Sequence, residues 1–253
     1  MANNKKYFFG DTEVSKEDKV KKVNEVFDSV AKRYDIMNDI LSFGAHRLWK
    51  AILVNSISNI ISSRREFRYL DLACGTGDIG YKLLDKKLKN INVLMMDINE
   101  KMLEQATKRK EYREHKKSID FIVSDAENIP LASNSIDCIA IAFGIRNVAS
   151  IENALFEINR VLKCGGKFLC LEFSNVEVPL LKKFYGFYSK NIIPEIGSYI
   201  VKDRRSYQYL VESIERFPKQ DELTDLFTKS GFINSKYINL SGGIACIHSG
   251  WKI

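Results

Sequence analysis

The stretch that decides the fold is YLDLACGTGDIG, from Tyr69 to Gly80. An apolar run leads into a glycine-rich turn and then into a helix, and Gly75, Gly77 and Gly80 complete a G-x-G-x-x-G pattern. Such a turn brings a ligand close to backbone N–H groups at the start of the helix. The pattern predicts a nucleotide-binding α/β domain, but by itself it does not separate NAD from another adenosine cofactor.

On either side of this stretch, short apolar runs alternate with segments of helical length. The apolar runs cover residues 67–73, 91–96, 119–124, 136–143 and 167–173, and the helical segments cover 78–85, 100–114 and 151–162. This alternation predicts a mostly parallel sheet. Two extended runs at 232–240 and 244–251 flank a Ser-Gly-Gly turn and predict an antiparallel strand pair that completes a seven-stranded sheet.

Three further segments surround the predicted sheet. Residues 1–14 lack periodicity, and we expect a flexible N-terminus. Residues 15–62 carry apolar residues at three- and four-residue steps and predict a helical cap, followed by a core over residues 63–253. Within the core, residues 178–230 predict a helical insert that is rich in tyrosine and phenylalanine.

Composition restricts the class of protein. The 253 residues are 45% hydrophobic, and 39 Lys and Arg against 32 Asp and Glu give a net charge of +7. Nucleic acid, anionic lipid and acidic metabolites are all compatible with this charge, although the basic residues are scattered. The five cysteines show no CxxC spacing, no residues are spaced as metal ligands, and no apolar stretch has the length of a membrane span. We therefore expect a cytoplasmic protein without a metal site.

Two carboxylates distinguish between the candidate cofactors. Asp71 precedes the glycine-rich turn and Asp78 begins the following helix, where a pyrophosphate would have to bind. A cationic ligand suits this loop better, so we expect S-adenosyl-L-methionine, with Asp71 or Asp78 facing its positive end. The N–H groups of the loop formed by Gly75, Thr76 and Gly77 would meet its carboxylate.

Acidic residues after the next two strands are expected to hold the rest of this cofactor. Asp97 ends the second strand, and its carboxylate is placed to accept from both ribose hydroxyls. Asp125 and Ala126 follow the third strand and are candidates for the adenine amine and ring. The alternatives are a helix N-cap for Asp97 and a local turn for Asp125.

The sequence resembles the ubiquinone/menaquinone biosynthesis C-methyltransferase family, from about residue 18 to the C-terminus. The segments that carry the resemblance are FDSVAKRYDIMNDILSFGAHRLWK (27–50), DLACGTGD (71–78), DINEKML (97–103), FGIRNV (143–148), RVLKCGGKFLCLEFS (160–174) and SYQYLVESIERFP (206–218). It implies a Rossmann-like class I methyltransferase that binds S-adenosyl-L-methionine. Ala142 stands where the family often has a serine that contacts the cofactor, so we assign no contact to it.

The resemblance also implies the reaction. The substrate would be a polyprenylated quinol, demethylmenaquinol and/or 2-methoxy-6-polyprenyl-1,4-benzoquinol, methylated at a ring carbon. Arg146 and Asn147 lie just beyond the fourth strand and are candidates to hold the quinolate oxygen, with a surface arginine and a capping asparagine as the alternative. Tyr34, Tyr185 and Tyr188 are candidates to line the substrate cavity, although aromatics at helical spacing also form cores.

Other classes of activity and partner stay open at this point. A class I methyltransferase acting on RNA or on another small molecule is the main alternative, followed by a nicotinamide-dependent oxidoreductase and a non-catalytic cofactor-binding module. Because the basic residues are dispersed, we expect no nucleic acid partner. The insert predicts either a peripheral contact with the inner membrane or docking to a quinone-biosynthesis complex, and homo-oligomerisation is left undecided.

Overall fold

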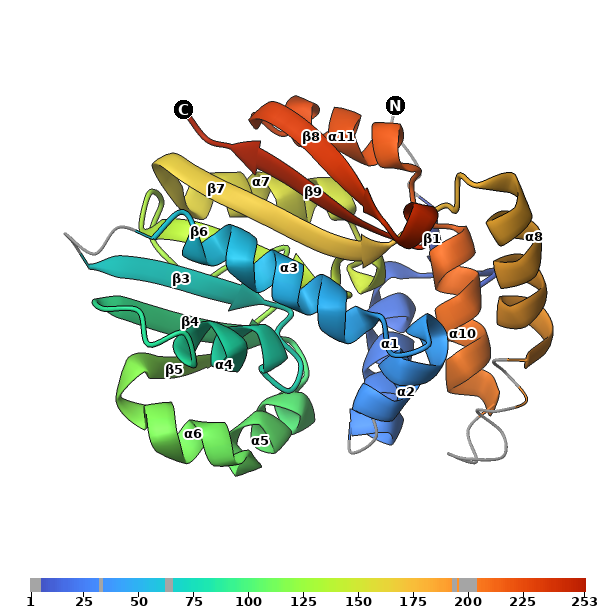
Figure 1. Cartoon of the computed structure of the whole chain (residues 1–253), viewed down its shortest axis with the longest axis horizontal. Helices are drawn as coiled ribbons and strands as arrows, with labels where there is room; N and C mark the ends of the chain where they lie inside the picture. The colour runs from blue at the N-terminus through green and yellow to red at the C-terminus, as the bar shows by residue number, and fades with distance from the viewer. Residues whose placement is uncertain (1–5, 32–33, 62–65, 193–194, 196–203) are drawn as a thin grey trace.

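Seven strands form one sheet in the order β5-β4-β3-β6-β7-β9-β8 (Figure 1). The computed structural model describes residues 6–31, 34–61, 66–192, 195 and 204–253. Strands β3 to β7 pair in parallel, and β9 is antiparallel to both of its neighbours. The predicted α/β class, with its antiparallel C-terminal pair, is confirmed. The strands span Phe67–Leu72 (β3), Ile91–Asp97 (β4), Ile119–Val123 (β5), Ile136–Ala142 (β6), Leu162–Phe173 (β7), Ile233–Leu240 (β8) and Ala245–Trp251 (β9).

The central strands are apolar along nearly their whole length because helices cover both faces of the sheet. In β6 only the last residue, Ala142, is not fully buried. Helices α3 and α4 pack on one face, and α7 and α11 pack on the other. The helices on or beside the sheet span His46–Ser58 (α3), Asp78–Leu84 (α4), Glu100–Lys108 (α5), Lys110–His115 (α6), Ile151–Val161 (α7) and Gln220–Lys229 (α11).

The strand order determines where an open sheet of this kind binds a ligand. The chain runs outward from β3 through β4 to β5, then returns to add β6 on the other side of β3. The connections that follow β3 and β6 therefore leave the sheet in opposite directions, and a crevice opens between them at the carboxyl ends of the strands. Ligands of open α/β sheets bind at such a switch point. The glycine-rich turn after β3 lies at this position.

The N-terminal hairpin was not predicted. Residues 7–14 form two short antiparallel strands, β1 (Tyr7–Phe9) and β2 (Thr12–Val14), joined at Gly10 with a positive φ of 56°. Residues 1–14 were expected to be a flexible segment without regular structure; residues 7–14 pair as this hairpin, and residues 1–5 lie outside the described part. The Phe9 ring stacks on Tyr209 at 4.3 Å. This contact joins residues 200 positions apart, so local periodicity could not reveal it.

Six elements lie beyond the carboxyl ends of the parallel strands or connect to them. In the predicted cap, Ser15 accepts from the Asp18 N–H at 3.0 Å and starts α1 as its N-cap. In the predicted insert, α8 lies at the right-hand edge of Figure 1, with α10 between it and the sheet. The bounds are Lys16–Val30 (α1), Tyr34–Ser42 (α2), Pro179–Phe187 (α8) and Arg204–Glu215 (α10), with short turns η3 (Ile145–Asn147) and η4 (Tyr188–Ile192).

Short 3₁₀ segments complete the secondary structure. They are η2 (Lys116–Ser118), which leads into β5, and η5 (Ser241–Gly243), which connects β8 to β9. Among the described residues, no helix is both long and apolar enough to cross a bilayer.

Candidate active site

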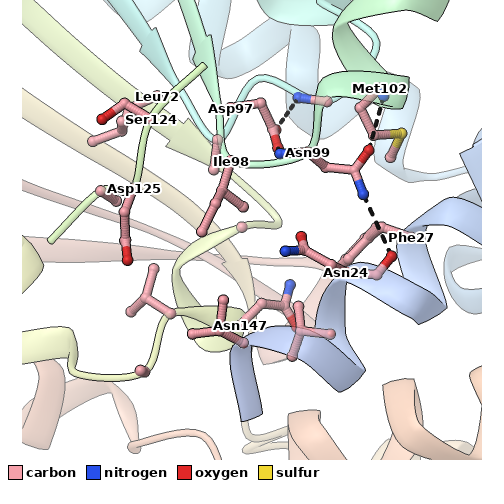
Figure 2. Close-up of a pocket in the computed structure, with 18 of the residues that line it drawn as sticks. Asn24, Phe27, Leu72, Asp97, Ile98, Asn99, Met102, Ser124, Asp125 and Asn147 are labelled. Carbon is pink, nitrogen blue, oxygen red and sulfur yellow. Dashed lines mark hydrogen bonds between the residues drawn. The ribbon is translucent and has the colours of Figure 1, made fainter. Parts of the chain in front are cut away.

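A pocket opens at the carboxyl ends of β3, β4, β5 and β6, and α1 covers it (Figure 2). In Figure 2, Asp97 and Asn99 lie on one side and Asn147 on the other, with Asn24 projecting between them. The lining residues are Val20, Val23, Asn24, Phe27, Leu72, Ala73, Gly75, Asp97, Ile98, Asn99, Met102, Ser124, Asp125, Ala126, Phe143, Gly144, Asn147, Val148 and Ala149. Five predicted site residues meet here: Gly75, Asp97, Asp125, Ala126 and Asn147.

Asp97 connects the glycine-rich turn to the next loop. Its Oδ2 accepts from the Gly75 N–H at 2.7 Å, and its Oδ1 accepts from the Asn99 N–H at 2.8 Å. Burial raises the pKa of this carboxyl above its usual value, against the lowering effect of the backbone hydrogen bonds. The N-cap of α5 is Asn99, which accepts from the Met102 N–H, so the N-cap alternative for Asp97 is wrong. Each carboxylate oxygen keeps a second lone pair for a ligand hydroxyl.

Asp71 and Gly77 support the turn from outside the pocket lining, and Thr76 lies outside this lining as well. Asp71 is buried, and its Oδ2 accepts from the Gly80 N–H at 2.9 Å. Burial raises the pKa of Asp71 to about 8, with a further contribution from the charge of Asp78. Gly77 has a φ of 77°, and a Cβ there would lie 2.8 Å from the Tyr81 ring, so this position requires glycine.

The charge of Asp78 is balanced by three cations. Its carboxylate lies 3.0 Å from the Lys50 Nζ, 3.5 Å from the Lys82 Nζ and 3.7 Å from the Arg109 guanidinium. Burial would raise the pKa of Asp78, but these cations outweigh it and lower the pKa. The expectation that Asp78 faces the positive end of a cofactor is therefore not supported, because its carboxylate is engaged within the protein.

Arg146 and Asn147 are consecutive residues of η3, yet the structure separates them. The Arg146 side chain is only 1% exposed and lies outside the pocket. Its guanidinium donates to Glu172 at 2.7 Å, to the Phe143 carbonyl at 2.8 Å and to the Ser213 hydroxyl at 3.3 Å. Both readings of Arg146, as a direct substrate contact and as a surface residue, conflict with this buried ion pair.

Asn147 does reach the pocket. Its Oδ1 accepts from the Tyr209 hydroxyl at 2.9 Å, which leaves the Nδ2 without a hydrogen-bond partner among the described residues. This amide nitrogen is therefore a donor available to a ligand. Asn147 does not act as the N-cap of the following helix, because Ser150 caps α7.

Asp125 and Ala126 follow β5 as predicted. Asp125 accepts from the Glu127 N–H at 2.9 Å, so its carboxylate forms the local turn that was the alternative reading. It also lines the pocket, and the two roles are compatible because only Oδ1 is used in the turn. Ala126 is buried beside it.

Of the three predicted tyrosines, the two that the structure describes, Tyr185 and Tyr188, do not line this pocket. The Tyr185 hydroxyl donates to the Leu41 carbonyl at 3.0 Å, and the Tyr188 hydroxyl donates to the Ile40 carbonyl at 2.7 Å. Both tyrosines therefore join α8 and η4 to α2. Tyr34 begins α2, but its side chain lies outside the described part of the structure.

Sequence reasoning missed the contribution of α1. Val20, Val23, Asn24 and Phe27 all face the pocket from this helix, and Asn24 is the polar member of an otherwise apolar face. The Asn24 Oδ1 is buried and has no hydrogen-bond partner among the described residues. An amide within an apolar stripe was the one signal available, and it points to contact with a ligand.

Ion pairs at both ends of α1 hold it over the pocket. Near its start, Lys16 pairs with Glu127 at 2.8 Å. Near its end, Asp28 pairs with Lys101 and accepts from the Asn99 Nδ2 at 2.8 Å. The loops after β4 and β5 therefore hold the helix that covers them.

One cluster of potential metal ligands occurs among the described residues. Asp85, Glu114 and His115 bring ligand atoms within 4.8 Å of one another on the surface, and His115 bonds Asp85 at 2.9 Å. The cluster lies outside the pocket lining. A pair between the partly buried His115 and the exposed Asp85 accounts for these contacts.

The fold is that of class I S-adenosylmethionine-dependent methyltransferases. A solved Thermotoga maritima protein, described as a SAM-dependent methyltransferase and possible histamine N-methyltransferase, superposes with a TM-score of 0.63 at 21% identity over 91% of this chain and all of that one. The [4+2]-cyclase SpnF superposes with a TM-score of 0.66 at 16% identity over 92% of this chain and 96% of that one. At these identities the likeness shows the fold alone.

The chain belongs to the ubiE/COQ5 methyltransferase family, whose profile matches residues 13–252. A Rhizobium meliloti relative named ubiquinone/menaquinone biosynthesis C-methyltransferase UbiE is 46% identical over 97% of this chain and 94% of its own. A relative of the same name from Rickettsia bellii is 47% identical over 97% and 98%. The predicted family, and with it the prediction of a methyltransferase enzyme, is confirmed.

Proposed function

We propose that this chain transfers a methyl group from S-adenosyl-L-methionine to a ring carbon of a polyprenylated quinol. The substrates in question are demethylmenaquinol and/or 2-methoxy-6-polyprenyl-1,4-benzoquinol. The observation that carries the proposal is a single pocket at the switch point of the sheet, with the Asp97 carboxylate on one side and the Asn147 amide on the other. The relatives named UbiE support the class of reaction.

The pocket residues fit an adenosine cofactor. Asp97 has lone pairs for the ribose hydroxyls, and we assign Asp125 and Ala126, which line the same pocket, to the adenine edge. Leu72, Ile98 and other apolar side chains would enclose the ring. The Gly75 turn faces the pocket, while Asp71 and Gly77 act by shaping this turn. Asn24 of α1 adds a buried carbonyl oxygen that no donor in the described part of the chain satisfies.

The chemistry of the quinol acceptor determines which steps the protein has to assist. A ring carbon becomes nucleophilic when a ring hydroxyl loses its proton, and its electron pair then forms the new C–C bond while the S–CH₃ bond breaks. The methylated ring carbon afterwards loses its own proton, which restores aromaticity. The cofactor supplies an activated methyl group. The protein holds the acceptor in line with that group and stabilises the quinolate oxygen.

Asn147 is the residue that we assign to the quinolate oxygen, through the Nδ2 donor that the pocket leaves available. Arg146 acts from behind the pocket: it fixes the Phe143 carbonyl and pairs with Glu172, and so it positions the loop that carries Asn147. Arg146 is therefore proposed as a positioning residue and Asn147 as a catalytic one.

The acceptor's polyprenyl tail resides in the bilayer, and α8 offers a surface that fits a lipid interface. Leu180, Phe184 and Phe187 recur at i, i+4 and i+7 and are 79%, 64% and 62% exposed. Lys182 and Lys183 are exposed on the same helix, which has no acidic residue. We propose that this face contacts the surface of an anionic membrane, with the protein otherwise cytoplasmic. A quinone-biosynthesis complex that docks the enzyme is the alternative route.

Methyl transfer to defined acceptors tests the proposal directly. The purified chain is expected to bind S-adenosyl-L-methionine but not NAD in calorimetric titration. It should also methylate a short-chain quinol at carbon, detected as a mass increase of one methylene group. Methylation of RNA instead of the quinol would favour the class I alternative, and transfer to neither acceptor would contradict the proposal.

A further inference from the structure

Two residues of α10 hold two consecutive residues of η3. The Tyr209 hydroxyl donates to the Asn147 Oδ1 at 2.9 Å, and the Ser213 hydroxyl accepts from the Arg146 guanidinium at 3.3 Å. Positions 209 and 213 are one helical turn apart, so both side chains leave the same face of α10. The loop that carries Asn147 is thus attached to a helix of the insert through side-chain bonds.

Tyr209 is itself held rigidly. It is 3% exposed, and the ring of Phe9 stacks on it at 4.3 Å with an interplanar angle of 10°. Lys22 of α1 and Arg205 of α10 lie over the Phe9 ring at 5.6 and 5.9 Å. Burial also raises the pKa of the Tyr209 hydroxyl, so it keeps its proton and acts as a donor at neutral pH.

The bond from Tyr209 engages the Oδ1 end of the Asn147 amide and leaves the Nδ2 end for the pocket. An asparagine amide has one acceptor end and one donor end, and half a turn about its last torsion exchanges them. A hydroxyl that donates to Oδ1 favours the orientation in which Nδ2 is directed elsewhere. Because Asn147 lines the pocket and its Nδ2 has no other partner among the described residues, the donor end is the one offered to a ligand.

We infer that Tyr209 is a positioning residue for methyl transfer, which fixes the Asn147 amide with its donor toward the quinolate oxygen. The inference rests on the proposed function of Asn147. If Tyr209 has this role, the N-terminal hairpin and the insert, which lie far apart in the sequence, both support the orientation of the Asn147 side chain.

The test compares Y209F, N147A and their double variant. Y209F keeps the ring that stacks on Phe9 and removes only the hydroxyl. We expect its kcat for the quinol to fall by about tenfold, the usual scale of one hydrogen bond, with the KM for S-adenosyl-L-methionine unchanged. N147A should lose about a hundredfold in kcat. The double variant should be no slower than N147A, because the bond acts only through Asn147.

A matched control removes another buried hydroxyl from the same helix. Tyr207 is fully buried on α10 and does not bond Asn147, so Y207F should keep the wild-type kcat. Equal losses in Y207F and Y209F would mean that the effect is one of packing and would overturn the inference. Additive losses in the Y209F and N147A double variant would overturn it as well.

A second measurement does not depend on activity. With ¹⁵N-labelled asparagine, the side-chain amide signal of Asn147, assigned by its absence in N147A, should shift in Y209F and stay in place in Y207F. An unchanged signal in Y209F would overturn the inference even if methyl transfer occurs as proposed. A shifted signal in a protein whose N147A variant has normal kcat would show that the bond exists but that Asn147 is not catalytic, which refutes the inferred role.

Discussion

Lys50 of α3 and Asp78 of α4 form an ion pair at 3.0 Å in which the lysine side chain is only 3% exposed. The pair joins the cap to the helix that follows the glycine-rich turn. Lys50 also lies 6.0 Å from the centre of the Phe143 ring, at the edge of the pocket. A buried charge of this kind is tolerated only while its partner is present.

Replacement of Lys50 by methionine should destabilise the protein strongly. Asp78 would keep only the more exposed Lys82 and the longer contact with Arg109. We expect the free energy of unfolding at pH 7 to fall by about 3 kcal/mol, measured by denaturant titration. The control K82M removes a partner that is 41% exposed and should cost under about 1 kcal/mol. Equal losses of unfolding free energy in K50M and K82M would show that the buried Lys50–Asp78 pair contributes no more than the exposed Lys82.

Asp71 should make the protein less stable as the pH rises. Burial raises its pKa in the folded state to about 8, against the ordinary value of 3.8, so between these values the folded state binds a proton that the unfolded state has lost. Stability therefore falls as pH increases, by up to about 1.4 kcal/mol per pH unit. Burial lowers the pKa of His248 to about 4, so above pH 6.5 this histidine adds little to the dependence of stability on pH.

The variant D71N isolates this effect because an amide oxygen can still accept from the Gly80 N–H. Between pH 6.5 and 8, the unfolding free energy of the wild type should decline relative to that of D71N. Parallel curves for the two proteins would show that Asp71 does not titrate in this range.

Asp97→Ala should weaken cofactor binding at least about tenfold, because two charge-assisted hydrogen bonds to the ribose are lost. Calorimetric titration measures the affinity, and a thermal melt shows that the variant is folded. The matched control is Asp85→Ala, an exposed carboxylate outside the pocket. Unchanged affinity in a folded Asp97→Ala protein would refute the ribose assignment.

Arg146→Ala should cost stability as well as turnover. It leaves Glu172, which is 1% exposed, without its partner, at about 3–5 kcal/mol. The double variant R146M/E172M removes both charges and should regain much of this stability, as thermal unfolding would show. We expect its kcat to stay low. A double variant that recovers full turnover would mean that Arg146 contributes only to folding.

Anionic vesicles should bind the protein weakly and in a salt-sensitive way, through the exposed face of α8. Phe184→Ser with Phe187→Ser should reduce co-sedimentation several-fold, and neutralisation of Lys182, Lys183, Arg204 and Arg205 together should reduce it at low salt. Arg205 is exposed on α10, whereas the side chain of Arg204 lies outside the described part.

The control for vesicle binding is Phe156→Ser, since Phe156 is 55% exposed on α7, away from α8. Vesicle binding that is equal in all variants, or absent at low salt, would leave a protein partner as the better route to the membrane.

The sequence predicted the sheet well because strand and helix periods are local properties. It also located the carboxylates at strand ends, since Asp97 and Asp125 both reach the pocket. It could not separate Arg146 from Asn147, because a one-residue step within a 3₁₀ turn rotates the side-chain direction by about a third of a turn. Nor could it assign Asp78, whose partner Lys50 lies 28 positions earlier on another helix.

Strand β9 is the last strand of the sheet to be synthesised, yet it lies between β7 and β8. β8 therefore has no edge to join until residues 245–251 have left the ribosome, because β9 is its only sheet partner among the described strands. Until then the edge of β7 stays unpaired, and the face of the sheet that α11 covers is incomplete. The order of biosynthesis thus delays closure of the sheet until its last strand has emerged, a stage at which binding of a chaperone to the nascent chain would protect it from aggregation.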